Sequence, residues 1–448
     1  MQKYIIKNVS IVNEGQTVQG DVLIKEERIA KIAPQITEPG AVREIDGEGQ
    51  VLIPGVIDDQ VHFREPGLTH KAEIATEARA AVAGGTTSFM EMPNTKPPAL
   101  TEAVLEDKYA LAGGHSLANY SFFMGVSNDN AEAVLKANAR KEEVCGVKIF
   151  MGSSTGNMLV DDYQTLEKIF AGSELLIATH CENETVIKRN LAKLREEKGD
   201  EGLRASDHPL IRSEEACFSS SQTAVDLALK HHSRLHVLHI TTAREPGLFS
   251  NKIPLADKRI TAEVCVHHLW FSAEDYERYG NQIKCNPAIK APANREALWV
   301  ALLDDRLDVI ATDHAPHSWA EKQQPYFKAP AGLPLVQHGL LMMLEQHKNG
   351  RISLELLVEK MCHAPAVCFR IRERGFIREG YYADLVLLDL NSPTKVAKGN
   401  LYYKCGWSPL EGHSFPAQIV YTFVNGRPVY GKDGFDESQM GMRLKFDR

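Results

Sequence analysis

The sequence predicts an α/β fold in which a (β/α)8 TIM-like barrel carries a small β-sandwich domain built from both termini. First, eight short apolar segments rich in β-branched residues recur through the middle of the chain, with helical patterns between several of them. Second, both ends of the chain alternate like β-structure. Third, 448 residues accommodate a barrel of roughly 250 residues and a smaller companion.

The terminal segments predict the β-domain. Residues 4–13 and 20–33 have the pattern of strands, with Gly15 and Gly20 at turns, and residues 383–390 have the same pattern. Residues 417–430 predict two strands around Asn425-Gly426, a pair suited to a type I′ hairpin turn. Neither end has enough apolar surface to fold alone. We therefore predict a composite β-domain of residues 1–54 and 367–448, and a barrel of residues 55–366.

The middle of the chain predicts the barrel. Helical patterns cover residues 70–85, where Gly84-Gly85 gives a stop signal, and residues 220–232. A doubly wound open sheet is the alternative, but the GxGxxG loop that usually follows its first strand is absent. The expected barrel strands lie within residues 51–58, 86–93, 118–126, 146–151, 175–182, 234–242, 260–269 and 308–316.

Composition limits the functional classes. Hydrophobic residues make up 43% of the chain and charged residues 25%, as in a globular protein with a full core. The net charge of −8, without a basic run, argues against nucleic acid or an anionic membrane as the partner. The sequence shows no signal-peptide core, and no apolar run approaches the roughly 18 residues of a membrane span. The eight cysteines contain no CxxC pair, so we expect reduced thiols in a soluble cytoplasmic protein.

Residue types that bind metals fall at the expected carboxyl ends of five strands. These ends converge on one face of a barrel, where such proteins carry out chemistry. A single histidine there is more often structural, but several converging polar side chains need a common partner. Imidazole and carboxylate groups together suit zinc, with manganese or iron as alternatives. The candidate metal residues are His62, Lys148, His180, His239 and Asp313.

Lys148 is the unusual member, because an ammonium group does not bind a cation. One interpretation is a lysine that binds an anion or pairs with an acid. The other is a neutral, desolvated amine that has added CO2 to form a carbamate, which bridges two metal ions roughly 3.5–4 Å apart. The residues alone leave both interpretations open.

Four stretches resemble the signature sequences of dihydroorotases in the amidohydrolase superfamily, and the resemblance extends over nearly the whole chain. They are residues 59–71 (DQVHFREPGLTHK), 91–97 (EMPNTKP), 311–317 (ATDHAPH) and 404–412 (KCGWSPLEG). Hydantoinases and allantoinases have a similar barrel but usually depart from FREPG and TDHAPH. The resemblance implies a metal-dependent cyclic amide hydrolase that reversibly closes N-carbamoyl-L-aspartate to L-dihydroorotate in de novo pyrimidine (UMP) biosynthesis.

The resemblance also implies a role for each candidate residue. Lys148 would carry the bridging carbamate, His180 and His239 would hold the more buried zinc ion, and His62 would bind the more exposed one. Asp313 would share that outer site and act as the catalytic acid and base. The groups that would hold the carboxylate and ring of the substrate are Arg64, Asn94, Asn286 and His317.

One position departs from the family pattern, because Gln60 stands where a histidine is expected. An amide oxygen is a weaker zinc ligand than imidazole. We therefore expect one tightly bound zinc ion and a second that is weakly held.

Two alternatives remain open at this point. The chain resembles other cyclic amidohydrolases, of the dihydropyrimidinase, hydantoinase or allantoinase type, and it also resembles inactive dihydroorotase-like subunits that serve as scaffolds. A small-molecule substrate is the expected ligand, and the protein partners to consider are a second copy, as a homodimer, and aspartate transcarbamoylase. Residues 152–157, which are small and polar, predict a loop that closes over the substrate, with Ser154 or Thr155 as hydrogen-bond donor.

Overall fold

The barrel of this computed structural model, which describes residues 2–152 and 157–448, has eight parallel strands that pair in chain order. A bridge between Val61 and His314 brings the last strand against the first, and the His62 amide donates to the His314 carbonyl at 2.7 Å. The predicted barrel is therefore confirmed. Its strands are β6 (Val56–Val61), β7 (Thr86–Glu91), β8 (Asn119–Gly125), β9 (Gly146–Phe150), β10 (Ile177–His180), β11 (Leu235–Val237), β12 (Ile260–Cys265) and β13 (Val309–Ala311).

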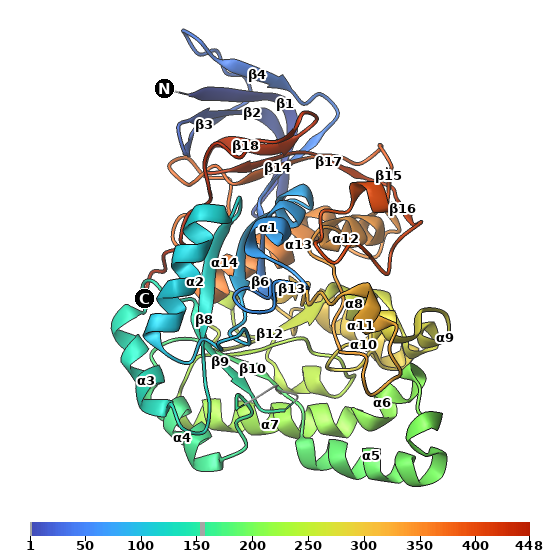
Figure 1. Cartoon of the computed structure of the whole chain (residues 1–448). Coiled ribbons are helices and arrows are strands. Elements are labelled where there is room, and N and C mark those ends of the chain that lie inside the picture. The colour runs from blue at the N-terminus through green and yellow to red at the C-terminus, as the bar shows by residue number, and fades with distance from the viewer. Residues whose placement is uncertain (1, 153–156) are drawn as a thin grey trace.

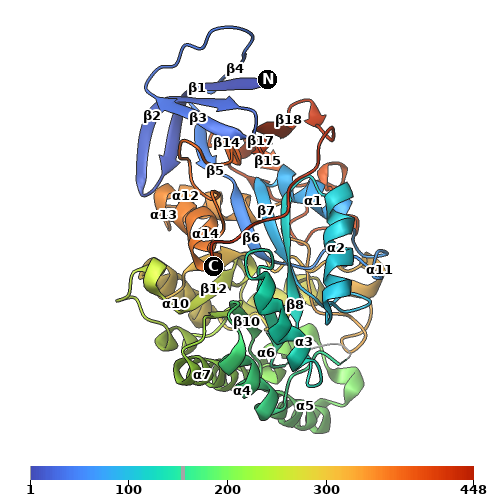
Figure 2. The same ribbon diagram turned by 90° about the vertical axis from the view of Figure 1, so that its left-hand side faces the viewer.

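Helices surround the barrel (Figures 1 and 2). Both predicted helical patterns form, as α1 and α7, and Gly84 caps α1 as expected. In the described part of the chain, no helix has the length and apolar character needed to cross a membrane. The helices are α1 (Ile74–Ala83), α2 (Glu102–His115), α3 (Ala131–Lys136), α4 (Tyr163–Gly172), α5 (Glu184–Lys198), α6 (His208–Ile211), α7 (Glu214–His231), α8 (Val266–Trp270), α9 (Tyr276–Tyr279), α10 (Pro292–Leu303), α11 (Trp319–Lys322), α12 (Gly339–Lys348), α13 (Leu354–Val358) and α14 (Ala364–Phe369).

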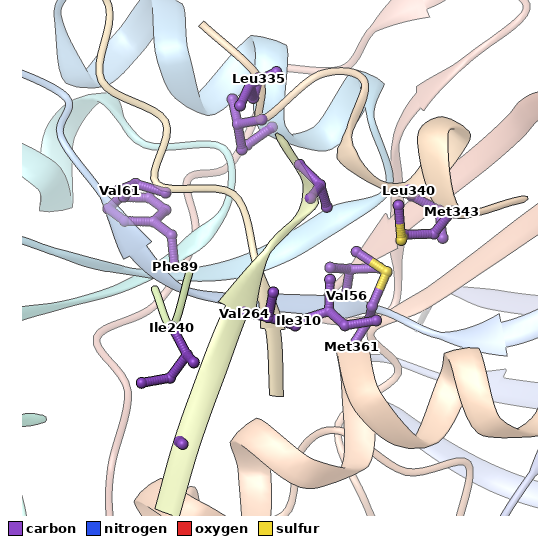
Figure 3. Packing of buried hydrophobic residues seen from close by; sticks show 14 of the residues in the cluster. Val56, Val61, Phe89, Ile240, Val264, Ile310, Leu335, Leu340, Met343 and Met361 are labelled. Atoms are coloured by element: carbon purple, nitrogen blue, oxygen red, sulfur yellow. The ribbon is translucent and has the colours of Figure 1, made fainter. Parts of the chain in front are cut away.

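Apolar side chains fill the layer between the barrel strands and the helices. In Figure 3, Val56 of β6, Val264 of β12 and Ile310 of β13 lie near Leu340 and Met343 of α12. All five are at most 2% exposed. Strands covered on both faces in this way have continuous apolar sequences, which is why the sequence showed them clearly.

A second sheet combines strands from both termini, as predicted, and lies at one side of the barrel (Figure 1). The expected strand at residues 20–33 is divided in two by a turn, and β4 was not predicted. Asn425 and Gly426 have φ angles of 50° and 77°, which confirms the expected type I′ turn between β17 and β18. The strands are β1 (Lys3–Asn13), β2 (Gln16–Lys25), β3 (Arg28–Ala33), β4 (Arg43–Asp46), β5 (Val51–Pro54), β14 (Leu385–Asp389), β17 (Gln418–Val424), β18 (Arg427–Gly431) and β19 (Gly434–Phe435), beside a separate pair, β15 (Thr394–Lys395) and β16 (Ser414–Phe415).

The chain passes from this sheet into the barrel at Gly55, between β5 and β6. A Cβ atom on Gly55 would lie 2.0 Å from the hydroxyl oxygen of Thr87, so only glycine fits this crossing. Beside it, the buried carboxylate of Asp384 accepts hydrogen bonds from Arg374, from the Asn425 amide at 2.8 Å and from the Asn119 side chain at 3.1 Å. This network ties the terminal sheet to the start of β8.

We predict that Asp384→Ala lowers the free energy of unfolding by about 3–5 kcal/mol, because it leaves the buried Arg374 cation without its partner. Urea denaturation followed by circular dichroism measures this change. Glu197→Ala is the control: Glu197 pairs with Lys193 in an exposed ion pair, and its loss changes the free energy by at most about 0.5 kcal/mol. Equal, small effects of the two substitutions would contradict the role assigned to the network.

Candidate active site

The strand ends place the five candidate metal residues around one cavity of about 90 Å³. His180 ends β10, while His62, His239 and Asp313 follow β6, β11 and β13 by one or two residues. Lys148 differs from the expectation, since it is the third of the five residues of β9 and not at its end. Its longer side chain nevertheless reaches the cavity. The lining residues are Gln60, His62, Arg64, Asn94, Lys148, Phe150, His180, His239, Asn286, Asp313, Ala315, Ala331 and Gly332.

His180 and His239 form the inner pair. The Nδ1 atom of His180 lies 2.9 Å from the Nε2 atom of His239, and the Glu182 carboxylate lies 3.0 Å from the other His180 ring nitrogen. Burial lowers the pKa of both imidazoles, so both are neutral at neutral pH. His239 has a φ of 41°, in the left-handed region, and the Glu263 carboxylate accepts a hydrogen bond from its amide at 3.1 Å. One of the two facing nitrogens donates a hydrogen bond to the other, and as neutral imidazoles both residues are of the type that binds zinc.

His62 and Asp313 form the outer pair. The His62 Nδ1 atom lies 2.8 Å from the Asn94 side-chain oxygen, so Nδ1 carries the proton and donates it. Burial lowers the pKa of His62, which keeps the ring neutral, and its Nε2 atom therefore faces the Asp313 carboxylate, 3.2 Å away, as a lone pair. Two acceptors at this separation repel one another unless a cation lies between them. The pair therefore fits a metal ion.

Lys148 is 1% exposed, and within the described residues its amine donates no hydrogen bond. The Nζ atom lies over the Phe150 ring, 4.6 Å from its centroid. Burial lowers its pKa to about 7, so a large fraction of the amine is neutral near pH 7, and the neutral amine is the form that adds CO2. A carbamate on Lys148 fits the donor set, because it adds a carboxylate that the inner and outer pairs could share.

Gln60 lies in the cavity wall. Its Oε1 atom lies 3.6 Å from the Cys265 sulfur, which donates to it. No imidazole replaces the expected histidine there, since within the described residues that line the cavity the only histidines are His62, His180 and His239.

Arg64, Asn94 and Asn286 line the cavity. Arg64 is held by the Pro316 carbonyl, 3.1 Å from its Nε atom, and burial lowers its pKa to about 10. It therefore stays cationic at neutral pH. In the described part of the chain it forms no ion pair, although its side chain is almost fully buried.

The structure places His317 behind this wall and not on the cavity itself. Its Nε2 atom lies 2.9 Å from the Ala331 carbonyl and 3.1 Å from a terminal nitrogen of Arg64, and its Nδ1 atom accepts from Lys71 at 3.0 Å. Burial and the two cations keep the pKa of His317 well below its usual value. Because Nδ1 accepts from Lys71, Nε2 carries the proton and donates to the Ala331 carbonyl, so His317 packs beside Arg64 without accepting a hydrogen bond from it, and its role as a direct substrate ligand stays a prediction. The predicted loop donors Ser154 and Thr155 lie outside the described residues.

Sequence reasoning missed part of the wall. Ala331 and Gly332 approach the cavity through their backbone, and a Cβ on Gly332 would lie 2.4 Å from the Ala315 carbonyl. The glycine was the only available signal, with a φ of 133° in the structure. The candidate set leaves out two buried groups of metal-type side chains: Cys265, His267 and His268, of which the histidines end an expected strand but were assigned no role, and Asp59, His236 and Glu263, which the sequence did not indicate.

Comparisons with known proteins show the family and the fold of this chain. A family model described as "Amidohydrolase family" matches residues 51–429. A dihydroorotase from Methanothermobacter thermautotrophicus is 31% identical over 88% of this chain and 87% of its own length. An allantoinase from Solibacter usitatus is 30% identical over 99% of this chain and 97% of its own length. The crystal structure of an L-hydantoinase (dihydropyrimidinase) from Arthrobacter aurescens superposes with a TM-score of 0.92 at 27% identity, covering 99% of this chain and all of that one.

We predict that Gln60→His slows the loss of the zinc ion that leaves the protein first. The outer pair has only His62 and Asp313 besides the Lys148 group, and a new imidazole would complete the four ligands that zinc prefers. The measurement is zinc per chain against time in a limiting amount of chelator. Identical loss curves for wild type and Gln60→His would show that Gln60, or a nearby group, already serves as the missing ligand.

Proposed function

This chain belongs to the amidohydrolase family, and from that premise we propose that it is a dihydroorotase. The proposed reaction is the reversible closure of N-carbamoyl-L-aspartate to L-dihydroorotate, a step of pyrimidine synthesis that leads to UMP. Closure consumes a proton, so acid favours the ring and alkali favours hydrolysis.

The unpaired Arg64 cation carries this proposal. A buried guanidinium without an ion pair is costly unless an anion reaches it, and here its open side faces the cavity. Dihydroorotate presents a carboxylate, for which the planar guanidinium offers a two-pronged hydrogen bond. Hydantoin, allantoin and dihydropyrimidine rings carry no such carboxylate, and they would leave the cation unpaired.

The amidohydrolase family is typically metal-dependent, and the inner and outer pairs with Lys148 supply a fitting donor set. A bound divalent ion supplies Lewis acidity, which polarises an amide carbonyl and lowers the pKa of water. We propose zinc ions, with Lys148 as its carbamate.

Asp313 is the proposed proton carrier. Its carboxylate lines the cavity beside His62. Asp313 follows the end of β13 by two residues and has a backbone φ of 46°, in the left-handed region. In hydrolysis it accepts the proton that the attacking water loses and passes it to the leaving ring nitrogen, and in closure the direction reverses. Asn94, which holds the His62 ring, keeps the neighbouring imidazole in the tautomer that leaves Nε2 free.

A second candidate function is hydrolysis of another cyclic amide. The likeness to an allantoinase over 99% of this chain and to an L-hydantoinase structure favours it. The substrate carboxylate discriminates between the two candidates, so experiments on Arg64 decide between them.

We predict that Asp313→Asn lowers the rate of both hydrolysis and closure by roughly 10²–10⁴-fold, the usual contribution of a positioned acid or base. Steady-state assays in both directions measure this loss, with zinc per chain and circular dichroism determined on the same samples. If the variant kept more than about a tenth of the wild-type rate, Asp313 would not be the proton carrier.

We predict that Arg64→Lys lowers kcat/KM for L-dihydroorotate by roughly 10–100-fold, because lysine keeps the charge but loses the two-pronged geometry. Activity on dihydrouracil, which lacks the carboxylate, should change little. Arg244→Lys is the matched control, since Arg244 lies in an exposed ion pair. Equal losses on the two substrates would mean that Arg64 supports the site without contacting the substrate's carboxylate.

A further inference from the structure

Three metal-binding side chains meet in the barrel interior, apart from the residues that line the cavity. Asp59 extends from β6, His236 from β11 and Glu263 from β12, and each is 0% exposed. One ligand atom from each lies within 4.8 Å of the others. We propose that these three residues bind a zinc ion, additional to any metal ion held by the cavity residues.

The separations favour a metal over a shared proton. The His236 Nε2 atom lies 3.2 Å from an Asp59 oxygen and 3.3 Å from a Glu263 oxygen. Ligands about 2.0 Å from a tetrahedral zinc ion lie about 3.3 Å from one another. Charge-assisted hydrogen bonds from a nitrogen to a carboxylate are shorter, about 2.7–2.9 Å.

The tautomer of His236 is fixed by its other nitrogen. Nδ1 lies 2.7 Å from the Thr261 hydroxyl oxygen, and that hydroxyl donates its own hydrogen to the Leu235 carbonyl at 3.3 Å. Nδ1 therefore carries a proton and donates it to Thr261. A donor bond from the second ring nitrogen is the usual way in which a metal-binding histidine is oriented, and it leaves Nε2 to bind the metal.

Asp59 supplies an independent observation: within the described residues neither of its buried carboxylate oxygens accepts a hydrogen bond, although the His236 Nε2 atom lies 3.2 Å from one of them. Glu245 is a buried carboxylate with hydrogen bonds to both of its oxygens: it accepts from the Ser221 hydroxyl at 2.6 Å and from the Thr242 hydroxyl at 2.9 Å. An uncompensated buried carboxylate is costly. A divalent ion beside a neutral imidazole would balance the charge of both acids.

The three residues can supply all four zinc ligands without a water molecule. Neither Asp59 oxygen accepts a hydrogen bond within the described residues, so binding of zinc through both oxygens fills the fourth position beside His236 and Glu263. The second Glu263 oxygen accepts from the His239 amide at 3.1 Å, which links the interior site to the backbone of a cavity histidine. A closed site without an open position is typical of structural zinc. The proposed ion therefore fastens β6, β11 and β12 together beneath the cavity.

The most direct test is a zinc-edge anomalous difference map from crystals of the wild-type protein grown with zinc. The proposal expects a peak bounded by Asp59, His236 and Glu263. A map with peaks only at the cavity, and none among these three side chains, would overturn it. This result does not depend on which cyclic amide the protein hydrolyses.

Zinc per chain in matched variants gives a second test. We expect Asp59→Asn to contain one zinc ion fewer than wild type, and Glu245→Gln, which changes a satisfied buried acid, to contain the same number. Combining Asp59→Asn with His239→Asn should add the two losses, because the ions differ. If the double variant lost no more zinc than His239→Asn alone, the two sites would be one and the proposal would fail. His236→Gln replaces Asp59→Asn in this series if the latter does not fold.

Discussion

Closure of the barrel between β6 and β13 is the constraint on which the site depends. The hydrogen bond from the His62 amide to the His314 carbonyl joins segments about 250 positions apart and brings His62 against Asp313. His314 is held in turn, since its ring contacts the Glu77 carboxylate at 2.7 Å and accepts the Leu335 amide at 2.9 Å. The outer pair exists only when the barrel is closed.

The residues of the signature stretches consequently fall into two classes: those that line the cavity and those that pack behind the cavity residues. In residues 311–317, Asp313 faces the cavity, whereas His314 closes the barrel and His317 lies behind Arg64. Residues 404–412 do not line the cavity: the Trp407 indole donates to the His317 carbonyl at 2.8 Å. These stretches therefore fix the geometry of Arg64 and Asp313 as well as supplying chemistry.

The sequence predicted the barrel and the terminal sheet because the spacing of apolar residues and the identity of turn residues indicate secondary structure locally. It also predicted most of the residues that line the cavity, because the carboxyl ends of barrel strands converge on one face even when the exact strand boundaries are unknown. It could not predict that His317 stands behind Arg64, or that Gly332 approaches the cavity by its backbone, since both depend on how loops pack across the barrel mouth. The group of Asp59, His236 and Glu263 escaped notice because its residues lie within strands, where side-chain direction is set by register and by the irregular pairing of β6.

The central claim is that the cavity binds a carboxylate with Arg64 while the inner pair and Lys148 face the reacting amide. A crystal structure of the zinc-loaded protein with L-dihydroorotate tests it most directly, since substrate and product both carry the carboxylate. We predict that the carboxylate lies within hydrogen-bond distance of the Arg64 guanidinium and that the ring amide lies toward His180 and His239. A ligand whose carboxylate points away from Arg64 would contradict the claim.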